Sequence, residues 1–161
     1  YMLARIVEKV TGMTCRDFLV PRLFTPLGIE NPQWHTDPMG HTLGATQLFL
    51  TLDEFSRLGR LLLGKGEYNG KRLVSEDYLK SLWDDTVPCG WPGCSEPECT
   101  AGYGYQVWRC AAPGTYRADG KYGQYCIVLP EQQTAVTITA HEELQPYEII
   151  HAVFDEIVPR L

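Results

Sequence analysis

The residues best suited to bind a substrate lie between Arg117 and Ala140, where a polar stretch with two glycines precedes two apolar runs. A glycine at a strand edge lets a ligand or another chain approach the backbone closely, because it has no side chain. Gly120 and Gly123 hold these positions and Lys121 lies between them. The pattern predicts a strand, a tight turn and a strand that could hold a small molecule. A glycine-rich hairpin without any ligand is the alternative.

Cysteine side chains are the second candidate for chemistry. The chain has six, and three of them are spaced Cys-x4-Cys-x4-Cys in the segment PCGWPGCSEPEC. Such thiolates could hold zinc with Cys110 or a histidine, but structural zinc sites favour shorter spacings and a matching second pair. A disulfide and ordinary loop thiols are the alternatives. We therefore predict no metal and no cofactor.

A long connector from Ile29 to Leu50, rich in Pro, Gly, Trp and His, is the third candidate. Connectors of this length often line a cleft. Trp34 is expected either to contact a substrate there or to anchor a core. His35 and His41 are expected to be solvated or hydrogen-bonded, since a single loop histidine has many such explanations.

The elements that must position these residues are helical in the first half of the chain. Apolar residues recur at helical spacing from Leu3 to Val10, and Gly12 supplies a stop. Polar caps predict the starts of three further helices, at Thr14, Thr51 and Ser75. Residues 1–83 are therefore expected to be mainly helical.

Strands dominate the second half, after a Cys- and Pro-rich loop at residues 84–101. The predicted strands, each followed by a short turn or loop, are Tyr103–Arg109, Tyr116–Asp119, Gln124–Leu129 and Thr134–Ala140. Short turns between successive strands favour an antiparallel meander. A last helix is expected from about Gln145. The fold class is thus α+β, with an antiparallel sheet and a C-terminal helix packed on it, and residues 1–161 are expected to form a single domain.

Composition excludes some functions. The formal charge of −6, without any run of Lys or Arg, argues against a nucleic-acid partner. No apolar run approaches the roughly 20 residues that span a bilayer. The sequence does not indicate a cellular location. Its first residues are already in a helical pattern without a cap, and we expect the chain to be the C-terminal portion of a longer protein.

The order of several segments resembles the β-lactamase-related serine hydrolases and penicillin-binding proteins, especially class C β-lactamases. The segments that carry the resemblance are IVEKVTG, DFLVPRLFTPLGIE, NPQWHTDPMG, LTLDEFSRLGRLLLGKGEYNGKRLVS, GYGYQVW and ADGKYGQYCIVLPEQQTAVTIT. They cover nearly the whole chain, with the Cys-rich loop as the weakest part. The resemblance implies part of a β-lactamase/transpeptidase-like fold.

The resemblance also implies a mechanism, in which a Ser-x-x-Lys supplies the nucleophile and a Tyr-x-Asn or Ser-x-Asn shuttles protons. Neither motif occurs in this chain, whose serines are Ser56, Ser75, Ser81 and Ser95. No catalytic residue is therefore predicted here. Acyl transfer would use a serine outside this chain, and the isolated chain is expected to be inactive.

The third motif of that family, a Lys/His-x-Gly strand that binds substrate, matches the segment Ala118-Asp119-Gly120. Gly120 keeps the glycine, whereas Ala118 lacks the usual cation or donor, and Asp119 would repel a carboxylate if it faced the cleft. The implied substrate-binding residues are Ala118, Asp119, Gly120, Lys121 and Trp34. A shifted register would place Lys121-Tyr122-Gly123 in the motif instead.

The resulting hypothesis is a hydrolase part that acts on a small ester, amide or β-lactam-like substrate. The altered motif keeps an alternative open, a non-catalytic relative that binds a ligand or partner. We expect Arg117 to pair with Asp119 or with a nearby glutamate. An exposed sheet edge would also favour self-association.

Overall fold

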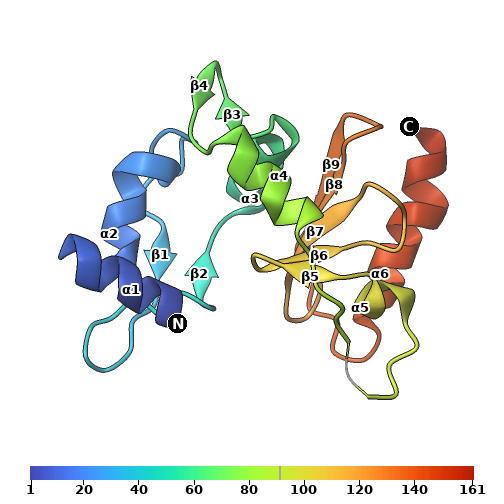
Figure 1. The fold of residues 1–161 in the computed structure, drawn as a ribbon, viewed down its shortest axis with the longest axis horizontal. Coiled ribbons are helices and arrows are strands. Elements are labelled where there is room, and N and C mark those ends of the chain that lie inside the picture. Colours follow the sequence, from blue (N-terminus) through green and yellow to red (C-terminus); the bar gives the residue numbers. More distant parts are fainter. Residues whose placement is uncertain (91) are drawn as a thin grey trace. The chain divides into compact units, whose positions relative to one another are not determined.

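The computed structural model describes residues 1–90 and 92–161, and the chain forms two compact units (Figure 1). The first unit spans residues 1–54 and the second spans residues 55–161. Helices and antiparallel strands make up the chain, which confirms the predicted α+β class. Each unit is described by itself below, and the single domain stays a prediction.

The first helix ends, and the second begins, where the sequence predicts. α1 (Met2–Thr11) stops at Gly12, whose φ of 71° is left-handed. α2 (Cys15–Leu19) is capped by Thr14, whose side chain accepts a hydrogen bond from the backbone N–H of Asp17. A π-helical turn, η1 (Val20–Phe24), continues it.

The core of the first unit is small. Phe24, Leu27 and Ile29 are each at most 2% exposed, and a short antiparallel pair, β1 (Gln33–Trp34) and β2 (Leu48–Phe49), follows them. On α1, Ala4 is the buried residue, whereas the larger apolar side chains remain exposed: Leu3, Ile6 and Val10. The apolar periodicity of α1 is therefore real, but that face has no cover among the described residues.

The capping box at Thr51 opens α3 (Leu52–Leu63) as predicted. The Thr51 hydroxyl accepts from the backbone N–H of Glu54, and the Glu54 carboxylate accepts from the backbone N–H of Thr51. β3 (Glu67–Tyr68) and β4 (Lys71–Arg72) then form a hairpin around Asn69 and Gly70, both at positive φ.

α4 (Glu76–Asp84) is capped by Ser75, whose hydroxyl accepts from the backbone N–H of Tyr78. The expected Cys- and Pro-rich loop at 84–101 contains a one-turn helix, α5 (Pro97–Thr100), which the sequence did not predict. Trp91 of the predicted Cys-rich motif lies outside the described residues.

A five-stranded antiparallel sheet forms the centre of the second unit, in the order β5-β6-β7-β8-β9. Its strands are β5 (Tyr103–Gly104), β6 (Val107–Arg109), β7 (Tyr116–Gly120), β8 (Gln124–Leu129) and β9 (Thr134–Ile138). The meander was predicted, but the single strand Tyr103–Arg109 was wrong. Tyr105 and Gln106 both take positive φ, 49° and 65°, and so turn this segment into a hairpin of two short strands.

The two faces of this sheet pack against different partners. On one face, Tyr116 of β7 and Val128 of β8 join α4 residues Leu79 and Leu82 in an apolar cluster. On the other face, Tyr125, Ile127 and Leu129 of β8 pack against Ile150 and Val153 near the C-terminus. Alternate residues of each strand therefore supply two separate cores.

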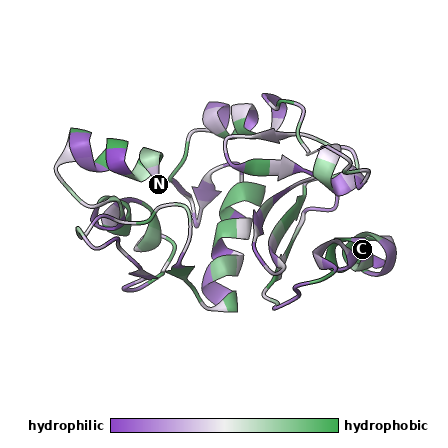
Figure 2. Ribbon diagram, turned by 90° about the horizontal axis from the view of Figure 1, so that it is seen from below, coloured by the Kyte–Doolittle hydropathy of each residue, from purple (hydrophilic) through white to green (hydrophobic). Residues whose placement is uncertain are grey.

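The last helix begins after Gln145, as predicted, and changes its winding along its length. α6 (Pro146–Ala152) is followed by the π-helical η2 (Val153–Ile157) and the 3₁₀ turn η3 (Val158–Arg160). Figure 2 shows this helix near the C label with both hydrophobic and hydrophilic residues, as expected for a helix packed on one side. Among the described residues, no helix has the length and apolarity to cross a membrane.

Candidate substrate-binding edge of β7

The register of the β7–β8 hairpin fixes which residues lie at the end of the strand. Gly120 pairs with Gln124, and Ala118 pairs with Cys126. Lys121, Tyr122 and Gly123 form the connecting turn, so the alternative register, with these three residues in the strand motif, is wrong.

The turn itself requires glycine at its last position. Tyr122 and Gly123 have φ of 68° and 87°, the left-handed region that glycine adopts without strain. A Cβ on Gly123 would also lie 2.6 Å from the Cδ1 of Ile149. Gly123 thus closes the hairpin against the C-terminal helix, and this is a structural role.

The last three residues of β7 present an unpaired backbone edge. β6 pairs only with the start of β7, at Tyr116 and Arg117, and the ladder stops there. Within the described part of the chain, no strand continues it along Ala118, Asp119 and Gly120. An extended amide- or ester-containing ligand could add to this edge through main-chain hydrogen bonds, as an extra strand would.

The exposure of Asp119 reflects this free edge. The residue as a whole is exposed, although only 22% of its side-chain surface is. Its exposed surface is therefore mostly main chain. Gly120 is not at positive φ, and a Cβ there would lie 2.9 Å from the Cβ of Gln124. The glycine at this position leaves room beside the last pair of the hairpin.

The structure separates the predicted site residues into three groups. Ala118 packs against the apolar cluster under α4. Asp119, Gly120 and Lys121 together line a hollow of about 210 Å³ with Tyr125, Glu142 and Tyr147. Trp34 lies in the first unit, where its ring N–H donates to the backbone oxygen of Thr46 at 3.0 Å and its ring meets Phe24 edge-on. Contact of Trp34 with a substrate stays a prediction.

Arg117 binds Asp119, one of the lining residues, and is itself fully buried, with 1% of its side chain exposed. Its Nε donates to Asp119 Oδ2 at 3.0 Å, and its Nη1 donates to Glu98 Oε2 at 3.1 Å. The guanidinium also donates to the backbone oxygens of Glu98 and Arg109, at 2.9 and 3.1 Å. The predicted pairing of Arg117 is confirmed, and it involves both kinds of partner.

Glu98 is the functional-site neighbour that the sequence did not reveal. It lies on α5 and is 3% exposed, and its Oε1 accepts from the backbone N–H of Ala111 at 3.0 Å. The sequence offered only a weak indication of this role, because Glu98 is an acidic residue inside a Pro- and Cys-rich segment. Its burial follows from the fold of that segment, because α5 places the carboxylate under β7.

Burial also changes the acid–base properties of this region. Removal from water raises the pKa of the Asp119 carboxyl, although Arg117 acts in the opposite direction. Burial likewise raises the pKa of the Cys110 thiol to about 11. The carboxylate of Asp119 is therefore held beside a cation but in an environment that disfavours its charge.

Two lining residues of the hollow, Lys121 and Tyr122, belong to a series of side-chain contacts at the turn. The Lys121 ammonium lies 4.6 Å from the centre of the Tyr122 ring, and that ring stacks on His141 at 4.7 Å. His141 in turn contacts Glu143 at 2.9 Å. Among the described residues, no ion pair joins Lys121 to Asp119.

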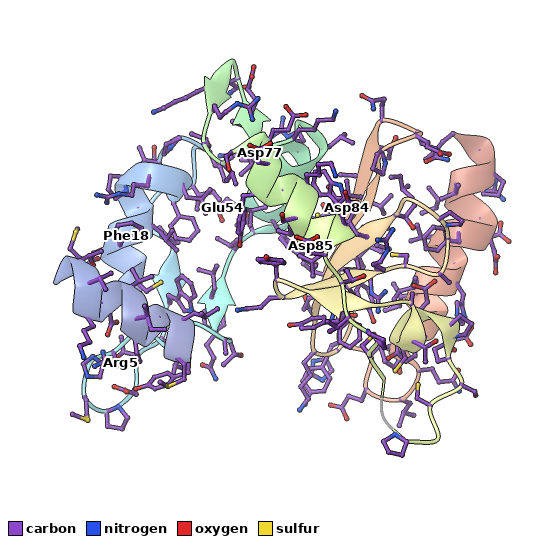
Figure 3. The ribbon with its side chains drawn as sticks, viewed as in Figure 1. Arg5, Phe18, Glu54, Asp77, Asp84 and Asp85 are labelled. Atoms are coloured by element: carbon purple, nitrogen blue, oxygen red, sulfur yellow. The ribbon has the colours of Figure 1, made fainter. Side chains whose placement is uncertain are left out.

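The other candidates from the sequence do not form a site. The six cysteines are thiols and not disulfides, and the described residues hold no group of three or more His, Cys, Asp or Glu that could bind a metal. His41 contacts Glu8 at 3.0 Å in the first unit. Asp84 and Asp85 lie at the end of α4 (Figure 3), where Asp84 pairs with Lys80 at 2.6 Å.

Comparison with known proteins places these features in context. The family model described as Beta-lactamase matches residues 1–153. No curated protein matches the chain. Among solved structures, a protein from Bacillus anthracis assigned by name to the 6-aminohexanoate-dimer hydrolases has a TM-score of 0.78 and 25% identity, over 98% of this chain and 40% of that one.

A second solved structure supports the fold alone. A protein from Bacteroides dorei DSM 17855, assigned by name to the beta-lactamases, has a TM-score of 0.68 and 15% identity, over 94% of this chain and 54% of that one. The present chain thus spans 40% and 54% of the lengths of these two structures.

Proposed function

Because the chain belongs to the Beta-lactamase family over residues 1–153, we propose that it forms the substrate-binding edge of a serine hydrolase that cleaves small amides or esters. The free backbone edge at Ala118–Gly120 carries this proposal. Such an edge can align the reacting carbonyl through N–H and C=O groups, and its N–H donors can stabilise the oxyanion that develops on it.

The nucleophile of this reaction is proposed to be a serine outside residues 1–161. The chain contains four serines, and none is followed three residues later by lysine. The serine oxygen would attack the carbonyl carbon and form an acyl-enzyme, releasing the amine or alcohol. Water would then hydrolyse the acyl-enzyme, releasing the acid and restoring the serine.

Open-chain amides and esters are the favoured substrates over β-lactams. The family position that begins the binding motif with a cation is Ala118 here, and its methyl group packs on the apolar cluster. A carboxylate-bearing β-lactam would therefore lose a charged contact at this position. The amide named for the Bacillus anthracis neighbour, a 6-aminohexanoate dimer, supports the choice of amide.

The test uses the whole protein that contains these residues and the 161-residue chain in parallel. Both are incubated with a chromogenic ester and with nitrocefin, and the covalent adduct is located by peptide mass spectrometry. We expect the whole protein to turn over the ester and to be acylated on a serine outside residues 1–161, whereas the chain alone does neither. Turnover by the chain alone, or acylation within it, contradicts the proposal.

A second candidate, a non-catalytic binding protein, is favoured by the same loss of the cation at Ala118. It predicts that the whole protein binds small amides without turnover or acylation. The same experiment therefore separates the two candidates.

A further inference from the structure

The charges buried under the free edge of β7 do not balance. The Arg117 guanidinium pairs with the carboxylates of both Glu98 and Asp119, so the cluster has one cation for two anions. The side chains of Arg117 and Glu98 are 1% and 4% exposed. Two carboxylates share one guanidinium, so the cluster keeps a net negative charge in a region that is largely removed from water. An added cation that reaches this cluster would offset that charge.

Asp119 is the member of this cluster that can meet an added cation. One of its oxygens, Oδ2, receives the Arg117 Nε, and within the described residues no other hydrogen bond to this carboxylate is found. Its side chain is 22% exposed and lines the 210 Å³ hollow at the end of β7. Glu98 has no such access.

The remaining walls of the hollow also suit a cation. Tyr125 and Tyr147 contribute aromatic rings, and Glu142 and Glu143 contribute carboxylates. The Glu142 carboxylate accepts from the backbone N–H groups of Leu144 and Gln145, which lowers its pKa and keeps it ionised. Lys121 is the opposing charge of the lining, and its ammonium lies over the Tyr122 ring. Aromatic faces and carboxylates together favour organic ammonium groups.

We propose that this hollow binds the primary ammonium end of an alkylammonium ligand, with the free oxygen of Asp119 as the acceptor. Resting on the proposed function, this assigns the substrate class: small amides or esters that carry an amino group at the end of an alkyl chain. Arg117 and Glu98 act as positioning residues, because they fix the Asp119 carboxylate without contacting the ligand.

The test is a titration of the 161-residue chain with hexylammonium, hexanoate and 1-hexanol, which share an alkyl chain and differ in charge. Backbone amide shifts in NMR spectra report the site, at pH 8 and constant ionic strength. We expect saturable shifts at Gly120, Lys121 and Glu142 with hexylammonium. Hexanoate and hexanol should bind about 10- to 100-fold more weakly, the range for loss of a charged hydrogen bond.

Two variants assign the effect to Asp119. Asp119→Asn keeps the shape and an acceptor for Arg117 but removes the charge, and it should weaken hexylammonium binding about 10-fold or more. Asp84→Asn makes the same change on α4, where Asp84 pairs with Lys80, and should leave binding unchanged. Circular dichroism of both variants checks that they are folded.

Four results would overturn the proposal, and three of them concern the size of the effect. Those three are equal binding of hexanoate and hexylammonium, unchanged binding in a folded Asp119→Asn variant, and equal shifts produced by sodium chloride at matched ionic strength. The absence of any saturable shift would also overturn it. Since the titration requires no turnover, its failure leaves the acyl-transfer proposal untouched, and a failed acylation experiment leaves the ammonium site untouched.

Discussion

The two faces of the five-stranded sheet differ in what β7 contributes to them. Tyr116 and Ala118 point to the apolar cluster with Leu79 and Leu82 of α4. On the opposite face, the same strand contributes Arg117 and Asp119, which belong to a buried ionic cluster with Glu98. The contribution of β7 to one face is thus apolar, whereas its contribution to the other is ionic and lies beside the apolar cluster that β8 forms with the C-terminal helix.

This difference indicates which residues of β7 can select a polar ligand. Apolar packing is non-directional, so the α4 face can hold the strand in place but cannot select a polar ligand. The ionic cluster is directional and carries an excess negative charge at Asp119 next to the free edge. Alternate residues of β7 therefore have different roles. Those on the α4 face hold the strand in place, and those on the opposite face can select a ligand.

The largest predicted effect comes from removing the shared cation. Arg117→Met keeps a long side chain but leaves the carboxylates of Glu98 and Asp119 buried without their guanidinium. We expect a loss of about 3–5 kcal/mol in the free energy of unfolding, the cost of breaking a buried ion pair from one side. Urea denaturation followed by circular dichroism measures it.

A triple variant serves as the control for Arg117. Arg117→Met combined with Glu98→Gln and Asp119→Asn removes all three charges, and it should recover most of the lost stability. If the single variant costs less than about 1 kcal/mol, the ionic face is no more demanding than an exposed ion pair, and the contrast between the faces fails.

An intermediate effect is expected on the apolar face. Leu79 is 2% exposed in the α4 cluster, and Leu79→Ala should cost about 3 kcal/mol through lost burial and the cavity that remains. The loss should be the same at pH 4 and pH 8, because no charge is involved. Leu144→Ala, at a residue that is 88% exposed, is the matched control and should stay within about 0.5 kcal/mol. A strong pH dependence of the Leu79 effect would argue against two independent faces.

The sequence predicted the local features of this unit well. The side chains of Thr51 and Ser75 cap their helices by accepting from the backbone N–H group three residues later. A few neighbouring residues of sequence are therefore enough to predict these caps. The β7–β8 hairpin and the pairing of Arg117 with Asp119 are also local, because the two residues are on the same face of one strand. The family resemblance predicted the fold as a whole, and the match over residues 1–153 confirms it.

The features that the sequence missed depend on contacts between distant segments. Glu98 meets Arg117 across 19 residues of chain, and only the path of the 84–101 segment brings them together. The β6–β7 ladder ends at Arg117 because the turn at Tyr105 and Gln106 shortens β6. Neither turn residue is a glycine, so the sequence does not predict their left-handed conformations. The free edge and the charge imbalance are therefore properties of the fold and not of any motif.

The smallest predicted effect concerns Asp119 itself. It tests whether ionisation of this carboxyl lowers or raises the stability of the folded chain. Burial raises the pKa of this carboxyl above its ordinary value of 3.8. The folded chain therefore holds the proton more tightly than the unfolded chain does. The stability that Asp119 contributes is fully present below pH 3.8 and is lost as the pH rises through the raised pKa.

The Asp119→Asn side chain does not ionise, so the variant keeps its stability as the pH rises. The variant and the parent should be about equally stable at low pH, and the variant should become the more stable one toward pH 8, by less than about 1 kcal/mol. Hexylammonium at saturation should reduce this difference, because the ligand supplies the missing cation to the parent alone. Should the parent instead gain stability over the variant as the pH rises, Arg117 would outweigh burial, the cluster would already be balanced, and the ionic face would have no need of an added cation.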